Sequence, residues 1–517
     1  MVKHQRRRFL AALAAAGIGS THPAGRAQGA RVFGDNPFKL GVASGYPTPD
    51  GAVLWTRLLD DPARADGGLP STAVTVGWEL AADEKFAQIV ARGMAEAEHA
   101  WAHSVHVEPV GLASDRWYWY RFTAGGFTSP VGRVRTAPAA ASMPERLRFA
   151  FASCQMYEQG WFSAYRQAVR DELDLMIFLG DYIYESSWGR DKVRFHSTPE
   201  PYSLADYRVR YAQYKSDPDL MTAHRAMPWV LTWDDHEVDN DYANDRAEDG
   251  TPRAQFLERR AAAYRAFYEH QPLPARMRPN GPDMRIYTRF DWGALASFFV
   301  LDGRQYRDPQ ACPTRAGGST TLDPAKCAEI DRPERSMLGA AQEAWLDSEL
   351  AATQARWNVI AQQTLMARFD RGSGARSRVW TDGWDGYPAA RRRLLGSVAA
   401  RKIANPVVIG GDVHMHMVAD LRAEGAPADG PVLASEFVCN GITSQGPAAD
   451  RLAPLLARNP HVKYARSEEK GYVRMELTRE RLTAEMVGVD NVKAADTQAR
   501  VIARFEVESG RPGARQL

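Results

Sequence analysis

The sequence predicts two structured parts, an all-β sandwich over residues 32–140 and an α/β domain over 146–510. In the first part, short aromatic and β-branched runs alternate with turn sequences, which is typical of a β-sandwich. From about residue 147 onward, apolar strand-like runs alternate with helical patterns, which favours an α/β domain with a largely buried sheet. A length of 517 residues is sufficient for two or more domains.

The first part contains several short candidate strands separated by turn residues such as those at 47–51 and 125–126. The alanine-, serine- and proline-rich stretch 137–144 predicts a linker to the second part. The strands are expected at 53–55, 74–78, 105–107, 117–122 and 131–135.

In the second part, helix 254–270 repeats Phe256, Ala263 and Phe267 on one face, which suits packing on a sheet. Further helices are expected at 161–171, 204–215, 340–354 and 388–401. Strands are expected at 147–152, 175–179, 229–233, 285–290, 294–301, 357–363, 407–410 and 433–439.

The first 27 residues have the features of a twin-arginine signal peptide. Arg6 and Arg7 precede a short apolar run, and small residues allow cleavage after Ala27. The alternative is a basic N-terminal helix. The signal predicts export by the twin-arginine translocation machinery, after folding, to the periplasm or beyond.

The charge balance argues against a nucleic-acid-binding surface, and the hydropathy argues against a membrane span. The segment 1–27 holds five of the 65 basic residues and no acidic one, so the remainder has 60 basic against 63 acidic residues. This balance gives no dedicated nucleic-acid surface. No apolar run after residue 27 reaches the ~20 residues of a membrane span, so the mature chain is expected to lack one.

Four cysteines are too few for a disulfide scaffold. Cys312 and Cys327 flank a loop and could form a disulfide outside the cytoplasm, although the sequence does not decide this. Cys439, in an apolar strand, is most simply a core residue. Cys154 directly follows a strand and begins a loop, which is a position suited to a ligand.

The most informative segment is 178–185, where an apolar strand runs into a Gly-Asp-x-x-Tyr turn. Gly180 allows a sharp bend, Asp181 follows it, and Tyr184 lies one turn further along. Carboxylates suit hard cations, and a phenolate suits a trivalent ion such as Fe3+. Comparable strand ends occur at 151–155, 232–240 and 409–414, and ligands collect at such ends in α/β sheets. Together they predict a multinuclear metal site.

The candidate ligands at these strand ends can also be interpreted as ordinary structural residues. Asp181 and Asp412 could each be a solvated turn residue, although Asp412 and His414 are two apart and face one side of extended backbone. His416 continues that parity but more simply contacts solvent or a carboxylate.

The segment 233–237 has three acidic residues around one histidine, a density that requires cations or solvent. An exposed acidic loop is the alternative. Asp235 and Asn240 are the preferred ligands, which leaves His236 as an acid or transition-state donor. Arg304 follows another strand and either contacts phosphate or forms a structural ion pair.

The chain resembles the PhoD-type alkaline phosphatase and phosphodiesterase family over almost its whole length. The motifs that carry the resemblance are Gly41-Val-Ala-Ser-Gly45, Val53-Leu-Trp-Thr-Arg57, Phe151-Ala-Ser-Cys-Gln155, Gly180-Asp-Tyr-Ile-Tyr-Glu185, Trp233-Asp-Asp-His-Glu237 and Gly411-Asp-Val-His414. The resemblance implies a four-layer metallophosphoesterase sandwich preceded by a fibronectin-like β-sandwich domain. It also implies Fe3+ and Ca2+ as cofactors.

By the same resemblance, the iron ligands are Cys154, Asp181, Tyr184 and His414. Asp181 bridges to calcium, and the calcium shell is completed by Asp235, Asn240 and Asp412.

The resulting expectation is an exported, metal-dependent phosphoesterase that acts on phosphate monoesters, diesters or both. A metal-activated hydroxide attacks phosphorus, His236 assists the leaving group, and Arg304 stabilises charge on the phosphate oxygens. One alternative is a phosphodiesterase of phospholipase D type, with a phospholipid substrate. Another is a non-catalytic calcium-binding envelope protein.

Overall fold

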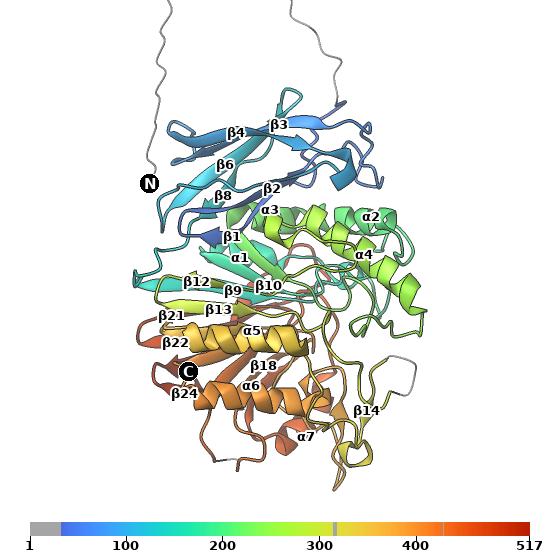
Figure 1. The fold of residues 1–517 in the computed structure, drawn as a ribbon, viewed down its shortest axis with the longest axis vertical. Coiled ribbons are helices and arrows are strands. Elements are labelled where there is room, and N and C mark those ends of the chain that lie inside the picture. The colour runs from blue at the N-terminus through green and yellow to red at the C-terminus, as the bar shows by residue number, and fades with distance from the viewer. Residues whose placement is uncertain (1–32, 314–317, 428) are drawn as a thin grey trace, which may run out of the picture.

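Two β-sheets lie face to face between two layers of helices (Figure 1). The structure is a computed structural model that describes residues 33–313, 318–427 and 429–517, so the expected signal peptide at 1–27 lies outside the described residues. The four-layer α/β sandwich with an N-terminal all-β module agrees with the predicted fold class.

The larger sheet has ten strands in the order β24-β23-β22-β21-β9-β10-β11-β1-β2-β5. Its central strands β9, β10 and β11 run parallel, so their carboxyl ends lie at one edge. The strands are β1 (Val42–Thr48), β2 (Gly51–Arg57), β5 (Ser104–Val107), β9 (Arg146–Ala152), β10 (Leu175–Leu179), β11 (Pro228–Thr232), β21 (Gly471–Thr478), β22 (Arg481–Val489), β23 (Ala499–Glu508) and β24 (Arg511–Gln516).

The second sheet has seven strands in the order β12-β13-β15-β17-β19-β18-β20. Strands β13, β15, β17 and β19 are parallel. The strands are β12 (Thr288–Trp292), β13 (Ala296–Val300), β15 (Trp357–Ala361), β17 (Pro406–Gly410), β18 (His416–Leu421), β19 (Ala434–Val438) and β20 (Val462–Arg466).

The main hydrophobic core lies between the two sheets. Phe149 of β9 meets Phe298 of β13 edge to face, with their ring centroids 5.3 Å apart. Ile177 and Val230 of the larger sheet and Val359 of the smaller one belong to the same buried cluster. Burial of these side chains stabilises the face-to-face arrangement by roughly 1.5–3 kcal/mol each.

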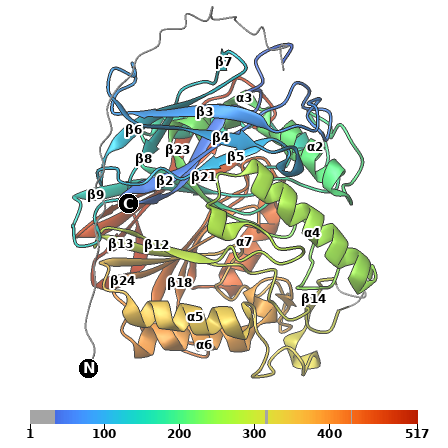
Figure 2. The same ribbon diagram turned by 45° about the horizontal axis from the view of Figure 1, so that its top comes forward.

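Helices cover the outer face of each sheet. On the larger sheet these are α1 (Ala164–Arg170), α2 (Leu204–Lys215), α3 (Pro218–Ala226) and α4 (Arg253–His270). On the smaller sheet, α5 (Gly339–Ala352) and α6 (Pro388–Ala400) lie side by side (Figure 2). Leu346 of α5 and Leu394 of α6 join Ile360 of β15 in a second core. Helix α7 (Ala449–Arg458) packs beside β20.

The N-terminal module is continuous with the larger sheet. Strand β1 pairs in parallel with β11, and Gly45 faces Trp229 across that pair. A Cβ at Gly45 would lie 2.6 Å from the carbonyl oxygens of Trp229 and Pro272, so the close approach requires glycine. The second layer of the module is a five-stranded sheet of β3 (Val74–Ala81), β4 (Ile89–Ala97), β6 (Trp117–Ala124), β7 (Phe127–Thr128) and β8 (Gly132–Arg135).

Several elements were not among those expected. They include β1, β4, α3, α7, β18, β20 and the antiparallel run β21–β24. In β22, the buried residues Leu482, Ala484 and Met486 alternate with more exposed ones. The sequence therefore contained the alternation of apolar and polar residues that predicts a strand. Two short strands, β14 (Thr321–Leu322) and β16 (Val379–Trp380), pair with each other beside the site described below.

Cys312 and Cys327, the pair that the sequence left open, are joined by a disulfide, with their Cα atoms 6.2 Å apart. Cys439 is buried, as expected of a core residue. Within the described ranges, no helix combines the length and apolar character needed to cross a membrane.

Candidate metal centre and active site

A cavity of about 600 Å3 lies where β10, β11 and β17 end. Two of these strands belong to the larger sheet and one to the smaller, so the cavity lies at the junction of the two sheets. Among the described residues that line it, nine carry carboxylates and one, Arg371, carries a guanidinium. Five of the nine acidic residues are buried, and such a density of buried acid groups favours bound cations.

The candidate ligands lie on tight turns with unusual backbone geometry. Cys154, Asp181, Asp412 and His414 all have φ between 54° and 65°, the left-handed region that non-glycine residues rarely adopt. Gly180 has φ 107°, and a Cβ there would lie 2.5 Å from the backbone of Asp234. Such strain concentrates at functional sites, where surrounding contacts hold it in place.

The four residues predicted to hold iron come together in the structure. Suitable ligand atoms of Cys154, Asp181 and His414 lie within 4.8 Å of one another. The Tyr184 hydroxyl lies 2.8 Å from Asp181 Oδ2 and 3.2 Å from His414 Nε2. A thiol, a carboxylate, an imidazole and a phenol therefore surround one point, although they come from three separate motifs.

His414 is oriented as a ligand would be. Its Nδ1 lies 2.8 Å from the backbone carbonyl oxygen of Gln445, which accepts a hydrogen bond from the ring. The Nε2 lone pair then faces Asp181 and Tyr184. A carbonyl that fixes the tautomer in this way is typical of histidines that bind metals.

Two buried carboxylate oxygens, Asp181 Oδ1 and Asp412 Oδ2, have no hydrogen-bond partner among the described residues. Burial raises the pKa of both carboxyls well above the usual range, and for Asp412 the neighbouring Asp234 and Asp235 add to this effect. A carboxylate left in this state is costly unless a cation compensates it. The residues present therefore fit bound metal ions.

A second group of acids extends the site. Asp235 forms one cluster with Asp181 and His236 and another with Asp241 and Asp382. Asn240 lines the cavity, and its side-chain nitrogen lies 2.5 Å from Glu248 Oε2. Asp241 and Asp382 were not among the predicted ligands.

His236 faces the cavity with its Nδ1 2.7 Å from Glu185 Oε2. Burial alone would lower the pKa of this imidazole, but the carboxylates of Glu185, Asp235 and Asp181 raise it well above its usual value. These carboxylates favour the protonated form of the ring, which is the form that a proton donor requires.

Arg304 lies outside the wall of the cavity. Its side chain is 2% exposed and pairs with Asp234, with Asp382 at 2.8 Å and with Asp235 at 3.6 Å. Of the two roles that the sequence left open for Arg304, this geometry favours the structural ion pair over contact with phosphate. The Arg304 guanidinium pairs with Asp235 without itself lining the cavity.

His416 also lies away from the cavity. It is buried, and its Nδ1 accepts a hydrogen bond from the backbone of Asn440, so it contacts neither solvent nor a carboxylate.

Two other residues, Glu237 and Ser444, shape the site although neither was a predicted ligand. Glu237 accepts hydrogen bonds from the backbone amides of Asp181, Tyr182 and Asp234, which fixes two ligand-bearing turns to each other. The Ser444 hydroxyl lies 2.7 Å from Tyr184 Oη. Glu237 lies in the acidic segment that the sequence singled out, but its contacts depend on the tertiary fold.

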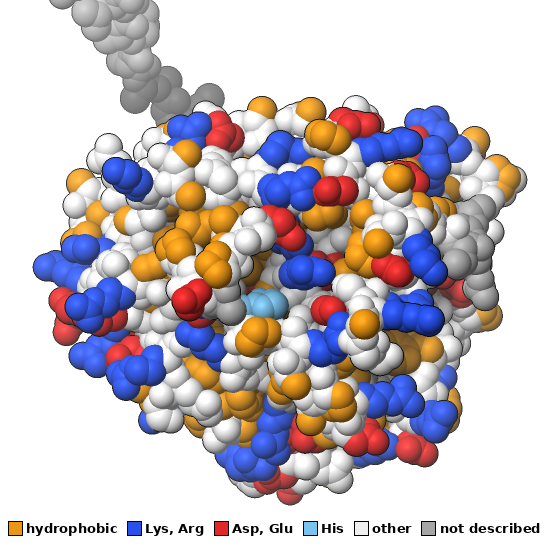
Figure 3. Space-filling view, turned by 90° about the horizontal axis from the view of Figure 1, so that it is seen from below, with side chains coloured by type: hydrophobic (Ala, Val, Ile, Leu, Met, Phe, Trp, Pro, Cys, Tyr) orange, Lys and Arg blue, Asp and Glu red, His pale blue; other side chains and the backbone are white. Residues whose placement is uncertain are grey.

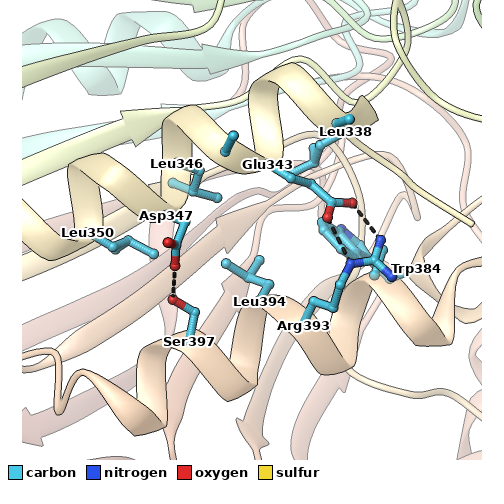
Figure 4. A pocket seen from close by; sticks show the side chains of 12 residues that line it. Leu338, Glu343, Leu346, Asp347, Leu350, Trp384, Arg393, Leu394 and Ser397 are labelled. Atoms are coloured by element: carbon cyan, nitrogen blue, oxygen red, sulfur yellow. Dashed lines mark hydrogen bonds and ion pairs between the residues drawn. The ribbon is translucent and has the colours of Figure 1, made fainter. Parts of the chain in front are cut away.

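A second cavity, of about 400 Å3, lies between α5 and α6 and is mainly apolar (Figure 4). Its charged groups are already paired, for example Glu343 with Arg393 at 2.7 Å. On the face shown in Figure 3, acidic and basic side chains are interspersed, which agrees with the balanced charge of the sequence. The acid-rich cavity is therefore the candidate active site.

This fold and these clustered groups define a hydrolase of the metallophosphoesterase class. Residues 149–486 match the PhoD-like phosphatase family, and residues 23–138 match the N-terminal domain of PhoD-like phosphatases. The chain belongs to the PhoD-like phosphatase family and is a phosphoesterase of the PhoD type.

Two relatives support this assignment. Alkaline phosphatase D of Bacillus subtilis (strain 168) is 46% identical over 456 residues, which cover 86% of this chain and 76% of that protein. A solved structure described as the structure of PhoD superposes with a TM-score of 0.89 at 42% identity, covering 94% of this chain and 93% of the other.

Proposed function

We propose that the chain is an alkaline phosphatase or phosphodiesterase that uses Fe3+ and Ca2+ to hydrolyse phosphate esters. The observation that carries the proposal is the convergence of Cys154, Asp181, Tyr184 and His414 around one point, with Asp181 and His414 lining the acid-rich cavity. The similarity to alkaline phosphatase D supports the same activity.

In this proposal, Cys154, Asp181, Tyr184 and His414 would hold the iron. Asp181 would also contact calcium, together with Asp235, Asn240 and Asp412. When bound, such ions supply Lewis acidity and lower the pKa of water.

The other residues act on the ester itself. Water attacks phosphorus in line with the leaving oxygen, and the bond from phosphorus to that oxygen breaks. Protonated His236, held by Glu185, donates its Nε2 proton to the departing oxygen. Glu237 and Arg304 keep the acid-bearing turns in place.

The twin-arginine sequence at 6–7 supports export, so we place the enzyme in the periplasm or outside the cell. Folding before translocation would allow the metals to be bound in the cytoplasm.

The first test is activity and metal dependence together. Protein purified without chelator is expected to contain iron and calcium and to hydrolyse a monoester, a bis-aryl diester or both.

Chelation of calcium should abolish turnover, and added Ca2+ should restore it, because oxygen ligands release calcium more readily than a thiolate releases iron. Phosphatidylcholine in a parallel assay tests the phospholipase D alternative. Full activity after confirmed metal loss would contradict the proposal.

The iron assignment has a spectroscopic test. Phenolate and thiolate donors give bound Fe3+ a visible charge-transfer band, so Tyr184→Phe should bleach or shift it and lower the rate at least tenfold, about 1.4 kcal/mol. Cys154→Ser should shift the band separately, because a hydroxyl is a poorer donor than a thiolate. Far-UV circular dichroism controls for unfolding. Wild-type colour, iron content and rate in both variants would exclude iron at this site.

A further inference from the structure

Arg371 differs from the other charged residues that line the active-site cavity. It lies on the loop before β16, partly buried, among nine carboxylate side chains. Within the described part of the chain, its guanidinium forms no hydrogen bond or ion pair. Arg304, by contrast, is bound by three carboxylates. Because arginine remains protonated in proteins, the cavity wall presents a cation with unused donors.

The loop holds this side chain in place. The guanidinium carbon lies 5.2 Å from the ring centre of Trp380 and 5.9 Å from that of Phe369. The Arg371 backbone amide donates to the carbonyl of Arg378, and Trp380 Nε1 donates to Ser319 Oγ at 3.2 Å. An arginine held by cation–π contacts with aromatic rings is pre-organised, so little entropy is lost when its fork binds an anion.

The loop lies next to the candidate metal ligands. Arg371 and Trp380 line the cavity together with Asp412, Val413 and His414. Burial lowers the pKa of Arg371, and the carboxylates of Asp385 and Asp412 oppose that effect. An anion bound beside Asp412 would be within reach of the same side chain.

From this geometry, and resting on the proposed phosphoesterase function, we propose that Arg371 binds a non-bridging oxygen of the substrate phosphate and that Trp380 is a positioning residue for it. The planar fork of arginine matches two phosphate oxygens, and charge-assisted hydrogen bonds of this kind are strong. The guanidinium would also balance the negative potential of the surrounding carboxylates, which otherwise repels an anionic substrate.

Inorganic phosphate, the product common to every phosphomonoester substrate, is the probe. Its Kd is measured by calorimetry on metal-loaded protein, alongside KM and kcat for an aryl phosphate. Arg371→Ala is expected to raise the phosphate Kd and KM at least tenfold with unchanged metal content, and Arg371→Lys should recover part of the loss. The matched control is Arg368→Ala, because Arg368 is exposed on the same loop and lies outside the cavity lining. It should stay within twofold of wild type.

Two variants of Trp380 test whether this residue positions Arg371 or only stabilises the protein. Trp380→Ala should raise the phosphate Kd, while Trp380→Phe, which keeps an aromatic ring beside Arg371, should restore it. An unchanged phosphate Kd in Arg371→Ala overturns the proposal. A higher KM with an unchanged phosphate Kd also overturns it, since Arg371 would then contact another anionic group of the substrate. Phosphate binding needs no turnover, so wild-type protein that binds phosphate but hydrolyses no ester would refute the function and not this contact.

Discussion

Asp181→Asn is expected to lower kcat/KM at least about a thousandfold, which corresponds to about 4 kcal/mol of transition-state stabilisation. Asp181 contributes to two of the three clusters of potential metal ligands in the described chain. Its Oδ2 accepts a hydrogen bond from the Tyr184 hydroxyl, and its Oδ1 is buried with no hydrogen-bond partner in the described ranges. Asparagine keeps the shape but removes the charge that both metals would share. Elemental analysis should show that the variant binds less of both metals.

The control for this variant is Asp249→Asn. Asp249 lines the same cavity but belongs to none of the three clusters. Its contacts are with Thr251, so its loss should change the rate severalfold at most. If Asp181→Asn kept the metal content and rate of the wild type, the site would have to be assigned to other residues.

Arg304→Met should destabilise the protein by about 3–5 kcal/mol, because it leaves buried carboxylates without their cation. Asp234, Asp235 and Asp382 all face the guanidinium, and each is buried. Activity should fall as a secondary effect, through displacement of Asp235. The free energy of unfolding in denaturant measures the expected loss.

Arg371→Gln is the matched comparison. Arg371 has no ion-pair partner among the described residues, so its replacement should leave the free energy of unfolding nearly unchanged while it weakens phosphate binding. If instead Arg304→Met kept full stability and only weakened phosphate binding, Arg304 would be a substrate contact after all.

Local signals in the sequence predicted the elements that carry the site. The apolar run 175–179 is β10, and the expected helix 204–215 is α2, whose start is fixed by a capping box of Ser203 and Asp206. Parallel strands end at a common edge, so motifs that follow such strands could be expected to meet. This reasoning accounts for Cys154 and Asp181, which follow neighbouring strands of one sheet. His414 follows β17 of the smaller sheet and joins them because the two sheets pack face to face.

Other features depend on contacts that a sequence does not display. Asp382 lies about 150 residues from Asp235, and only the packing of the two sheets brings them together. Arg304 and Arg371 both lie on loops between strands, yet Arg304 is enclosed by carboxylates while Arg371 forms no ion pair with any described residue. The difference lies in their neighbours in the fold. The N-terminal strands have ordinary β patterns that say nothing about which sheet they join.

The parallel pairing of β1 with β11 makes the amino-terminal segment a structural support for the catalytic region. Strand β11 leads directly into Asp235 and His236, and β1 occupies its outer edge. Without that neighbour, the backbone donors and acceptors of β11 would face water or another chain, and such an edge invites aggregation. A fragment that starts at residue 146 would therefore lack the lateral support of its own active site. Recombination between family members should be least disruptive where the exchanged piece carries β1 and β11 together.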